Sequence, residues 1–171
     1  MSTQIFLHIE VQGRNITGEA TTSGYEGEIE VNSFELGMEV RGTSSQTGTT
    51  KRQLSYGNLS ITKYYDKASV NLARALERDA VFDHLRLTVD QHRIETQQQK
   101  DQSPIMLIEL FDGRIEKIDI KLNDGGDKGA TIEESIEFSY RKLEVGYVPL
   151  DVARRRRQAG MTFSATLPAV D

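Results

Sequence analysis

Apolar and polar residues alternate along most of the chain, and a period of two is typical of strands that bury one face. Over residues 5–11 four aliphatic residues alternate with Phe6, His8 and Glu10, which predicts a half-buried strand. Similar patterns predict further strands at residues 29–40, 54–61, 85–94, 105–111, 115–122, 136–147 and 161–167. Residues 112–114 predict a kink or tight turn, and the Gly-rich residues 13–27 and 125–129 predict loops.

Inside three of these predicted strands the apolar residues shift between odd-numbered and even-numbered positions, which we call a change of parity. The parity changes at Asn32-Ser33, at Gly57-Asn58, and between Tyr140 and Leu143. A strand that keeps one face dry cannot change parity without a bulge or a sharp bend. Three such changes favour a strongly coiled sheet, as in a small barrel, over a flat one.

Only residues 69–79 have the period of an amphipathic helix, with Leu72, Ala75 and Leu76 spaced as one apolar stripe. Asp66 or Ser69 is the predicted cap. The sequence therefore predicts a mainly β fold: a small β-barrel of two strongly bent antiparallel sheets with one flanking α-helix. We expect residues 1–171 to form a single domain, since one core commonly serves a chain of this length.

Composition excludes several functions. The absence of cysteine excludes thiol catalysis, thiolate metal sites and disulfides. A formal net charge of −5 argues against a nucleic-acid partner, which needs clustered cations. Residues 154–157 are four consecutive arginines, and we interpret them as an exposed connector or a contact with a neighbouring protein.

The search for chemistry predicts no enzyme, no cofactor and no metal. His84 and His92 lie about 26 Å apart on one predicted strand, at roughly 3.3 Å per residue, and are expected to face solvent with Arg86, Thr88 and Asp90. Residues 123–127 carry carboxylates near glycines but lack the later glutamate of a calcium loop. The acidic pairs Glu133/Glu134 and Glu28/Glu30 are interpreted as solvated charges. No nucleophile elbow or phosphate loop is present.

Targeting signals are also absent from the sequence. The apolar runs are far shorter than the roughly 20 residues that span a bilayer, so no membrane anchor is expected. The first residues lack the basic start and apolar stretch of a signal peptide. We therefore expect the protein in the cytoplasm, from where any export uses a route without a cleaved signal peptide.

Residues 59–72 carry the motif L-S-x-T-K-x-x-D-K-x-S-x-x-L, which resembles the signature of the haemolysin co-regulated protein (Hcp) family. Residues 29–38 resemble the second strand of that family, and residues 136–143 resemble a late strand. Hcp proteins are inner-tube subunits of bacterial type VI secretion systems. The motif places a strand directly before the only predicted helix. Its residues are Leu59, Ser60, Thr62, Lys63, Asp66, Lys67, Ser69 and Leu72.

The resemblance implies a non-enzymatic structural role. Six copies would form a ring, and rings would stack into a tube that a contractile sheath propels, a spike protein caps, and effector proteins occupy. Glu35 and Glu39 would face the lumen, opposite the core residues Phe34, Leu36 and Met38. A long Ser/Thr/Gly-rich loop would reach the adjacent ring. Its residues are Arg41, Gly42, Thr43, Ser44, Ser45, Gln46, Thr47, Gly48, Thr49, Thr50, Lys51, Arg52 and Gln53.

Three alternatives stay open at the level of sequence. A tail-tube protein of a phage-like contractile particle would share the fold. A monomeric ligand-binding β-barrel would need an apolar cavity with a few polar groups. An enzyme built on scattered carboxylates would leave no motif.

Overall fold

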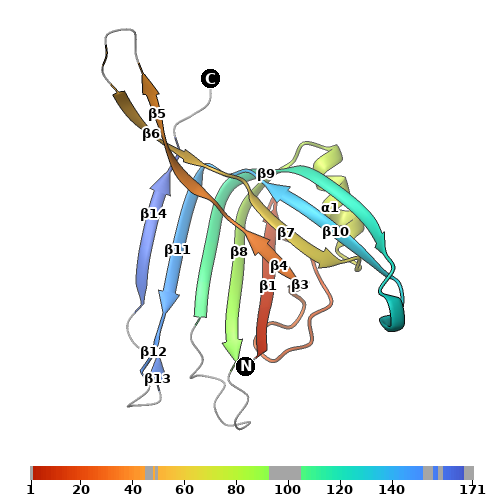
Figure 1. The fold of residues 1–171 in the computed structure, drawn as a ribbon. Helices are drawn as coiled ribbons and strands as arrows, with labels where there is room; N and C mark the ends of the chain where they lie inside the picture. The colour runs from red at the N-terminus through yellow and green to blue at the C-terminus, as the bar shows by residue number, and fades with distance from the viewer. Residues whose placement is uncertain are drawn as a thin grey trace.

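The computed structural model describes residues 2–44, 48, 50–92, 105–151, 156–157 and 160–167. Within these residues the chain is mainly β with one α-helix, which confirms the predicted class (Figure 1). The strands are β1 Ser2–Val11, β2 Arg14–Asn15, β3 Ile29–Val31, β4 Ser33–Glu35, β5 Met38–Ser44, β6 Thr50–Tyr56, β7 Leu59–Tyr64, β8 Val81–His92, β9 Ile105–Asn123, β10 Thr131–Phe138, β11 Lys142–Val148, β12 Leu150–Asp151, β13 Arg156–Arg157 and β14 Met161–Thr166. The helices are α1 Ser69–Glu77 and the short 3-10 helix Gly126–Lys128.

Antiparallel pairing runs around most of the core, and the chain itself connects the two ends of the path. Strands β1, β8, β9, β10, β7 and β4 pair in that order. β4 follows β3 after the single residue Asn32, and β3 pairs back to β1. The two bent sheets therefore join through β9 on one side and through the β3–β4 segment on the other, as expected for a small barrel.

The joint on the first side is a kink in β9, where a kink or a turn was predicted. Asp112 adopts a left-handed backbone with φ of 53°. The next residue is Gly113, where a Cβ atom would lie 1.9 Å from the carbonyl oxygen of Ser139. Only glycine fits this approach, so the sequence permits one 19-residue strand to serve both sheets.

The three changes of parity prove to be breaks between strands, and not bulges within long strands. Asn32 separates β3 from β4, Gly57-Asn58 separates β6 from β7, and residues 139–141 separate β10 from β11. The hydroxyl of Tyr140 donates a 2.8 Å hydrogen bond to the carbonyl oxygen of Gly57, which joins two of the breaks. Burial, and to a smaller extent the neighbouring Tyr56, raises the pKa of the Tyr140 hydroxyl to about 12, so the hydroxyl keeps the proton that it donates.

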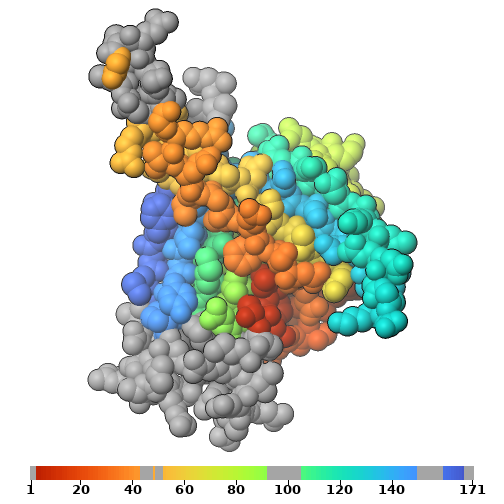
Figure 2. Space-filling view, in the orientation of Figure 1, coloured from red at the N-terminus to blue at the C-terminus, as the bar shows by residue number. Residues whose placement is uncertain are grey.

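The segment 41–53, for which we predicted a loop, is mostly a two-stranded ribbon. The predicted conformation of this segment was therefore wrong. Strands β5 and β6 pair from Met38 opposite Tyr56 to Ser44 opposite Thr50. Paired backbones satisfy the hydrogen bonds of a segment that has no apolar anchor of its own. The ribbon projects from the barrel (Figures 1 and 2). Of the predicted loop, residues 45–47 and 49 lie outside the described residues.

Part of the outer face of β1 and β8 is buried, although the alternation predicted a solvated one. Residues 16–28 cover it, and Phe6 stacks on Tyr25 with ring centroids 4.1 Å apart. The Tyr25 hydroxyl donates to an Asp90 carboxylate oxygen at 3.0 Å. Phe6, Thr88 and Asp90 are therefore buried. A covering loop joins distant residues, so period two alone could not reveal it.

Helix α1 ends at Glu77, two residues before the predicted end. Asp79 adopts a φ of 50°, and the amide of Ala80 donates to the Ala75 carbonyl, which is a typical helix termination. The N-cap residue is Ala68, so neither predicted cap holds that position. Among the described residues, no helix is long and apolar enough to cross a membrane.

Candidate functional site

A buried lysine lies where strand β7 meets helix α1. The side chain of Lys63 is 0% exposed, and its ammonium lies 2.9 Å from Glu134 Oε1 and 2.9 Å from Asp66 Oδ1. It also donates to the Ser69 hydroxyl at 2.9 Å and to the Tyr64 carbonyl oxygen at 3.0 Å. Four acceptors thus surround the three protons of one ammonium.

Strand periodicity places both members of the main ion pair inside. In β7, Lys63 shares the inward face with Leu59 and Ile61. In β10, Glu134 shares it with Ile136 and Phe138, and Glu134 lies directly opposite Lys63 in the register. The sequence contained this signal, because the same alternation that predicted the strands assigns both charges to the core side.

Asp66 and Ser69 connect this ion pair to the start of the helix. The Asp66 carboxylate accepts a hydrogen bond from the Ala68 amide at 3.0 Å, and the Asp66 amide donates to the Ser69 hydroxyl at 3.0 Å. The Ser69 hydroxyl lies 3.1 Å from Glu134 Oε1. The cluster therefore ties α1 to β7 and β10. With its lysine inaccessible, it supports a structural role and not contact with a substrate.

The remaining motif residues divide between the core and the surface. Leu59 and Leu72 are fully buried. Ser60 and Thr62 lie on the outer face of β7, where Thr62 shares a hydrogen bond with Ser33. Lys67 is exposed in the turn before the helix. The structure thus brings together Lys63, Asp66 and Ser69 and separates the other motif residues from them.

Two residues that we interpreted as solvated charges are buried. Glu134 is 1% exposed for the reason given above. Glu28, the last residue of the covering segment, is also buried, and its Oε1 lies 3.5 Å from an Arg86 guanidinium nitrogen. Glu30 is exposed, and Glu133 accepts a 2.7 Å hydrogen bond from Asn123.

The two residues expected to face a lumen are exposed, but their surroundings differ from the prediction. Glu35 in β4 lines a small hollow of about 180 Å³ with Ser60 and Thr62. Glu39 lies on the projecting ribbon and pairs with Arg41 at 2.7 Å. Met38 is 51% exposed and does not belong to the core, because the ribbon leaves the barrel at this residue.

The histidines are less solvated than predicted. His8 and His84 are half-buried and lie 3.2 Å from Glu10 and 2.8 Å from Glu109, respectively. The side chain of His92 lies outside the described part of the chain. Within that part, no group of three or more His, Asp or Glu side chains could hold a metal ion.

The predicted arginine connector is described only in part. Arg156 and Arg157 form β13, which pairs with β12. Arg154, Arg155 and the side chains of the whole run lie outside the described residues.

Apolar side chains are exposed at two free sheet edges, a feature that the sequence patterns did not reveal. Among the described residues, the edge strand β14 on one side pairs only with β11, and Phe163 is 48% exposed beside Met161 and Tyr147. On the other side, β10 is the one described strand that pairs with the second half of β9, and Leu122 is 69% exposed beside Ile120 and Ile132. We call these the β14 patch (Tyr147, Met161, Phe163) and the β9 patch (Ile120, Leu122, Ile132).

Both patches continue the inner apolar face of the barrel past the elements that cover it. In the register, Phe163 lies opposite Val145, and Val145 lies opposite the buried Ile108. Leu122 and Ile132 lie opposite one another on the face that carries Glu134. The patches occupy opposite sides of the molecule, with β14 at one side and the β9–β10 hairpin at the other (Figures 1 and 2).

Comparison with known proteins agrees with this fold. The model of the family described as "Type VI secretion system effector, Hcp" matches residues 6–147. No curated protein matches the sequence. Among solved structures, a double mutant of Hcp1 from E. coli EAEC 042 has a TM-score of 0.74 at 17% identity, covering 96% of this chain and 99% of that one.

Two further solved structures resemble the chain over nearly their whole length. Hcp1 from Salmonella typhimurium has a TM-score of 0.70 at 20% identity, covering 98% of this chain and 96% of that one. The secreted protein Hcp3 from Pseudomonas aeruginosa has a TM-score of 0.63 at 19% identity, covering 98% and 100%. At these identities the likeness concerns the fold.

Proposed function

The chain belongs to the Hcp family of type VI secretion proteins, and from this premise we propose that it is a non-enzymatic tube subunit that forms hexameric rings. The observation that carries the ring is the pair of exposed apolar patches on opposite sides of the subunit. Large apolar patches on a soluble protein commonly mark interaction surfaces. Here the β14 patch of one copy would meet the β9 patch of the next.

Such a contact is heterologous, because each copy uses two different surfaces. A heterologous contact forms a ring when its rotation closes and a filament when it does not. Two free strand edges also offer unpaired backbone donors and acceptors to a neighbour. A neighbouring copy would cover apolar side chains and pair an edge in the same step, which accounts for both features.

The β5–β6 ribbon would join one ring to the next. It projects from the barrel, and Met38, Val40 and Leu54 are exposed on it. Val40 lies opposite Leu54, so these side chains share one face of the ribbon. An apolar face on a projecting hairpin suits contact with another molecule. Glu35 and Glu39 are proposed to face the lumen of the tube.

The remaining partners of the proposed tube follow from family membership. They are a contractile sheath around it, a spike protein at its tip and effector proteins in its lumen. The protein would be made in the cytoplasm and leave the cell with the tube, without a cleaved signal peptide. We propose no catalytic residue, no cofactor and no nucleic-acid partner for the single domain.

Shortening the ribbon should separate ring formation from stacking. We expect a variant in which Asn-Gly replaces residues 41–53 to keep six subunits in each ring but to form no tubes. Val40 and Leu54 are a register pair, so a two-residue turn can join them without disturbing the barrel. Native mass and negative-stain microscopy check the two outcomes. Normal tubes from the shortened protein would exclude the ribbon as the stacking element.

A further inference from the structure

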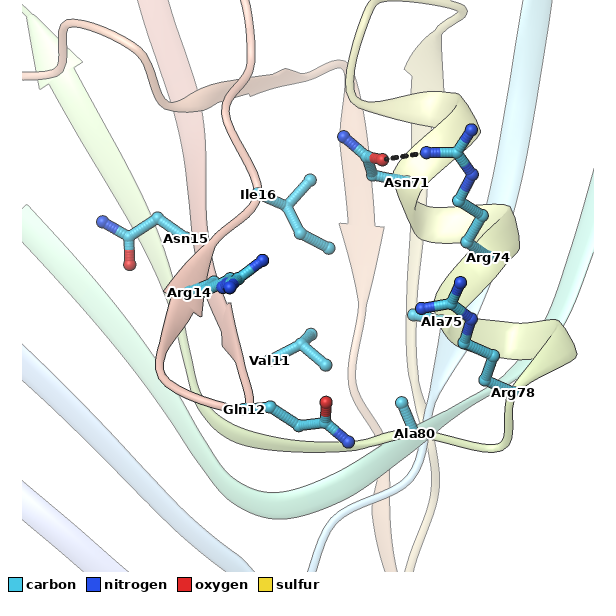
Figure 3. A pocket seen from close by; sticks show the side chains of 10 residues that line it. All are labelled: Val11, Gln12, Arg14, Asn15, Ile16, Asn71, Arg74, Ala75, Arg78 and Ala80. Atoms are coloured by element: carbon cyan, nitrogen blue, oxygen red, sulfur yellow. Dashed lines mark hydrogen bonds between the residues drawn. The ribbon is translucent and has the colours of Figure 1, made fainter.

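A cationic hollow of about 620 Å³ lies between helix α1 and the turn that joins β1 to β2 (Figure 3). Arg14 lies on the strand side, and Arg74 and Arg78 lie on the helix side. Val11 and Ile16 lie between the two sides and give the hollow an apolar floor. The residues that line it include no aspartate or glutamate.

These arginines are not neutralised within the described part of the chain. Arg74 donates a 3.3 Å hydrogen bond to the amide oxygen of Asn71, and no ion pair links any of the three arginines to a described acidic side chain. Nearby carboxylates are engaged elsewhere. Asp79 pairs with Arg114 at 3.3 Å, and Asp83 accepts the Gly13 amide at 2.9 Å.

The helix dipole explains only part of this arrangement. Arg74 and Arg78 lie at the C-terminus of α1, where a cation is favourable. Arg14 comes from a different element and gains nothing from that dipole. Three guanidinium groups around one concavity, in a protein with net charge −5, concentrate positive potential where an anionic group would dock.

The lining favours carboxylates over phosphates or nucleotides. Guanidinium groups bind carboxylates with paired hydrogen bonds, and three separated arginines match single charges spaced along a chain. A dense phosphate cluster would face the negative end of the helix dipole, where no backbone amides converge. No aromatic side chain lines the hollow to stack on a base.

We propose that this hollow binds an acidic peptide segment of another protein, its carboxylates paired with Arg14, Arg74 and Arg78 and its aliphatic atoms on Val11 and Ile16. A volume of about 620 Å³ accommodates several residues. The alternating residues Glu26, Glu28 and Glu30 do not make a second copy such a segment, because they lead into strand β3 of the folded barrel and Glu28 is buried. The inference does not depend on ring formation.

Fluorescence anisotropy with a fluorescein-labelled decapeptide of alternating glutamate and alanine tests the proposal. We expect the wild-type protein to bind this probe at 50 mM NaCl and to bind it more weakly at 300 mM NaCl. The triple variant R14Q/R74Q/R78Q should bind it at least tenfold more weakly. All three side chains are exposed, so the variant should retain the fold.

A matched variant controls for net charge. K117Q/K128Q/R141Q removes three positive charges from exposed positions that do not line the hollow, and its affinity for the probe should stay within twofold of wild type.

The proposal would be overturned by no binding by wild type, by undiminished binding by R14Q/R74Q/R78Q, by equal loss in both variants, or by tighter arginine-dependent binding of tripolyphosphate than of the peptide. Native mass is measured on the same samples. A change of ring mass caused by R14Q/R74Q/R78Q alone would assign the hollow to a second copy and reject the proposed partner. Loss of peptide binding at unchanged ring mass supports the proposed peptide site. The tube proposal is tested by other experiments.

Discussion

Replacing Lys63 with methionine is expected to lower the free energy of unfolding by about 3–5 kcal/mol. The variant leaves the buried Glu134 carboxylate without its cation and removes a donor from Ser69 and Asp66. Burying an unpaired charge costs far more than losing a surface ion pair. Urea denaturation followed by circular dichroism, at one fixed protein concentration, measures the change.

Two variants make this result specific to the buried cluster. Lys117→Met changes a lysine whose side chain is 58% exposed, and we expect it to alter stability by less than about 0.5 kcal/mol. Adding Glu134→Leu to Lys63→Met should recover part of the loss, because the uncompensated carboxylate disappears. A loss below about 1 kcal/mol for Lys63→Met alone would show that the cluster does not hold the junction.

Placing aspartate at Phe163 or at Leu122 is expected to convert rings into monomers. Each substitution puts a charge on a patch that the proposed contact would desolvate, and such a charge is costly when buried without a partner. The two variants act on opposite sides of the subunit and should give the same monomer. Light scattering at micromolar protein concentration measures the mass, and circular dichroism checks that the fold persists.

Neighbouring positions provide the matched controls. Thr162 and Lys121 are exposed on the same strands, and their side chains point to the other face. Thr162→Asp and Lys121→Asp should therefore keep the ring mass. If all four variants dissociate alike, charge repulsion in general would explain the result, and the patches would lose their assigned role.

Much of the fold could be predicted, because strand periodicity reports directly on burial. The changes of parity at Asn32 and Gly57 predicted an irregularity at each of these points, although the irregularity proved to be a break between strands and not a bulge or bend within one. The helical stripe around Leu72 predicted α1, although its end depended on the backbone of Asp79. Sequence patterns predicted these features because each feature depends on residues that are close together in the sequence.

The incorrect predictions of solvent exposure have two causes: burial by residues that are distant in the sequence, and the assumption that charged side chains lie in solvent. Thr88 and Asp90 are buried by residues 16–28, which lie far away in the sequence. Glu134 had the right periodicity for burial, but we assigned it to solvent because acidic residues are seldom buried unless paired. The cross-strand position of Lys63 supplied that pair.

The hollow was invisible in the sequence for a different reason. Arg14 and Arg78 belong to elements that meet only in the folded barrel, and no local pattern links them. The same holds for the two apolar patches, whose exposure depends on where the neighbouring strands and the helix end.

Native mass across a dilution series tests the central claim most directly. The account predicts about six times the monomer mass of 19.2 kDa at micromolar concentration, with a central hole in micrographs. Dilution should shift the mass toward one subunit, because the assembly of separate copies depends on protein concentration by mass action. A protein of 19.2 kDa at every concentration, with no rings in micrographs, would contradict the account and reduce the family likeness to a shared fold.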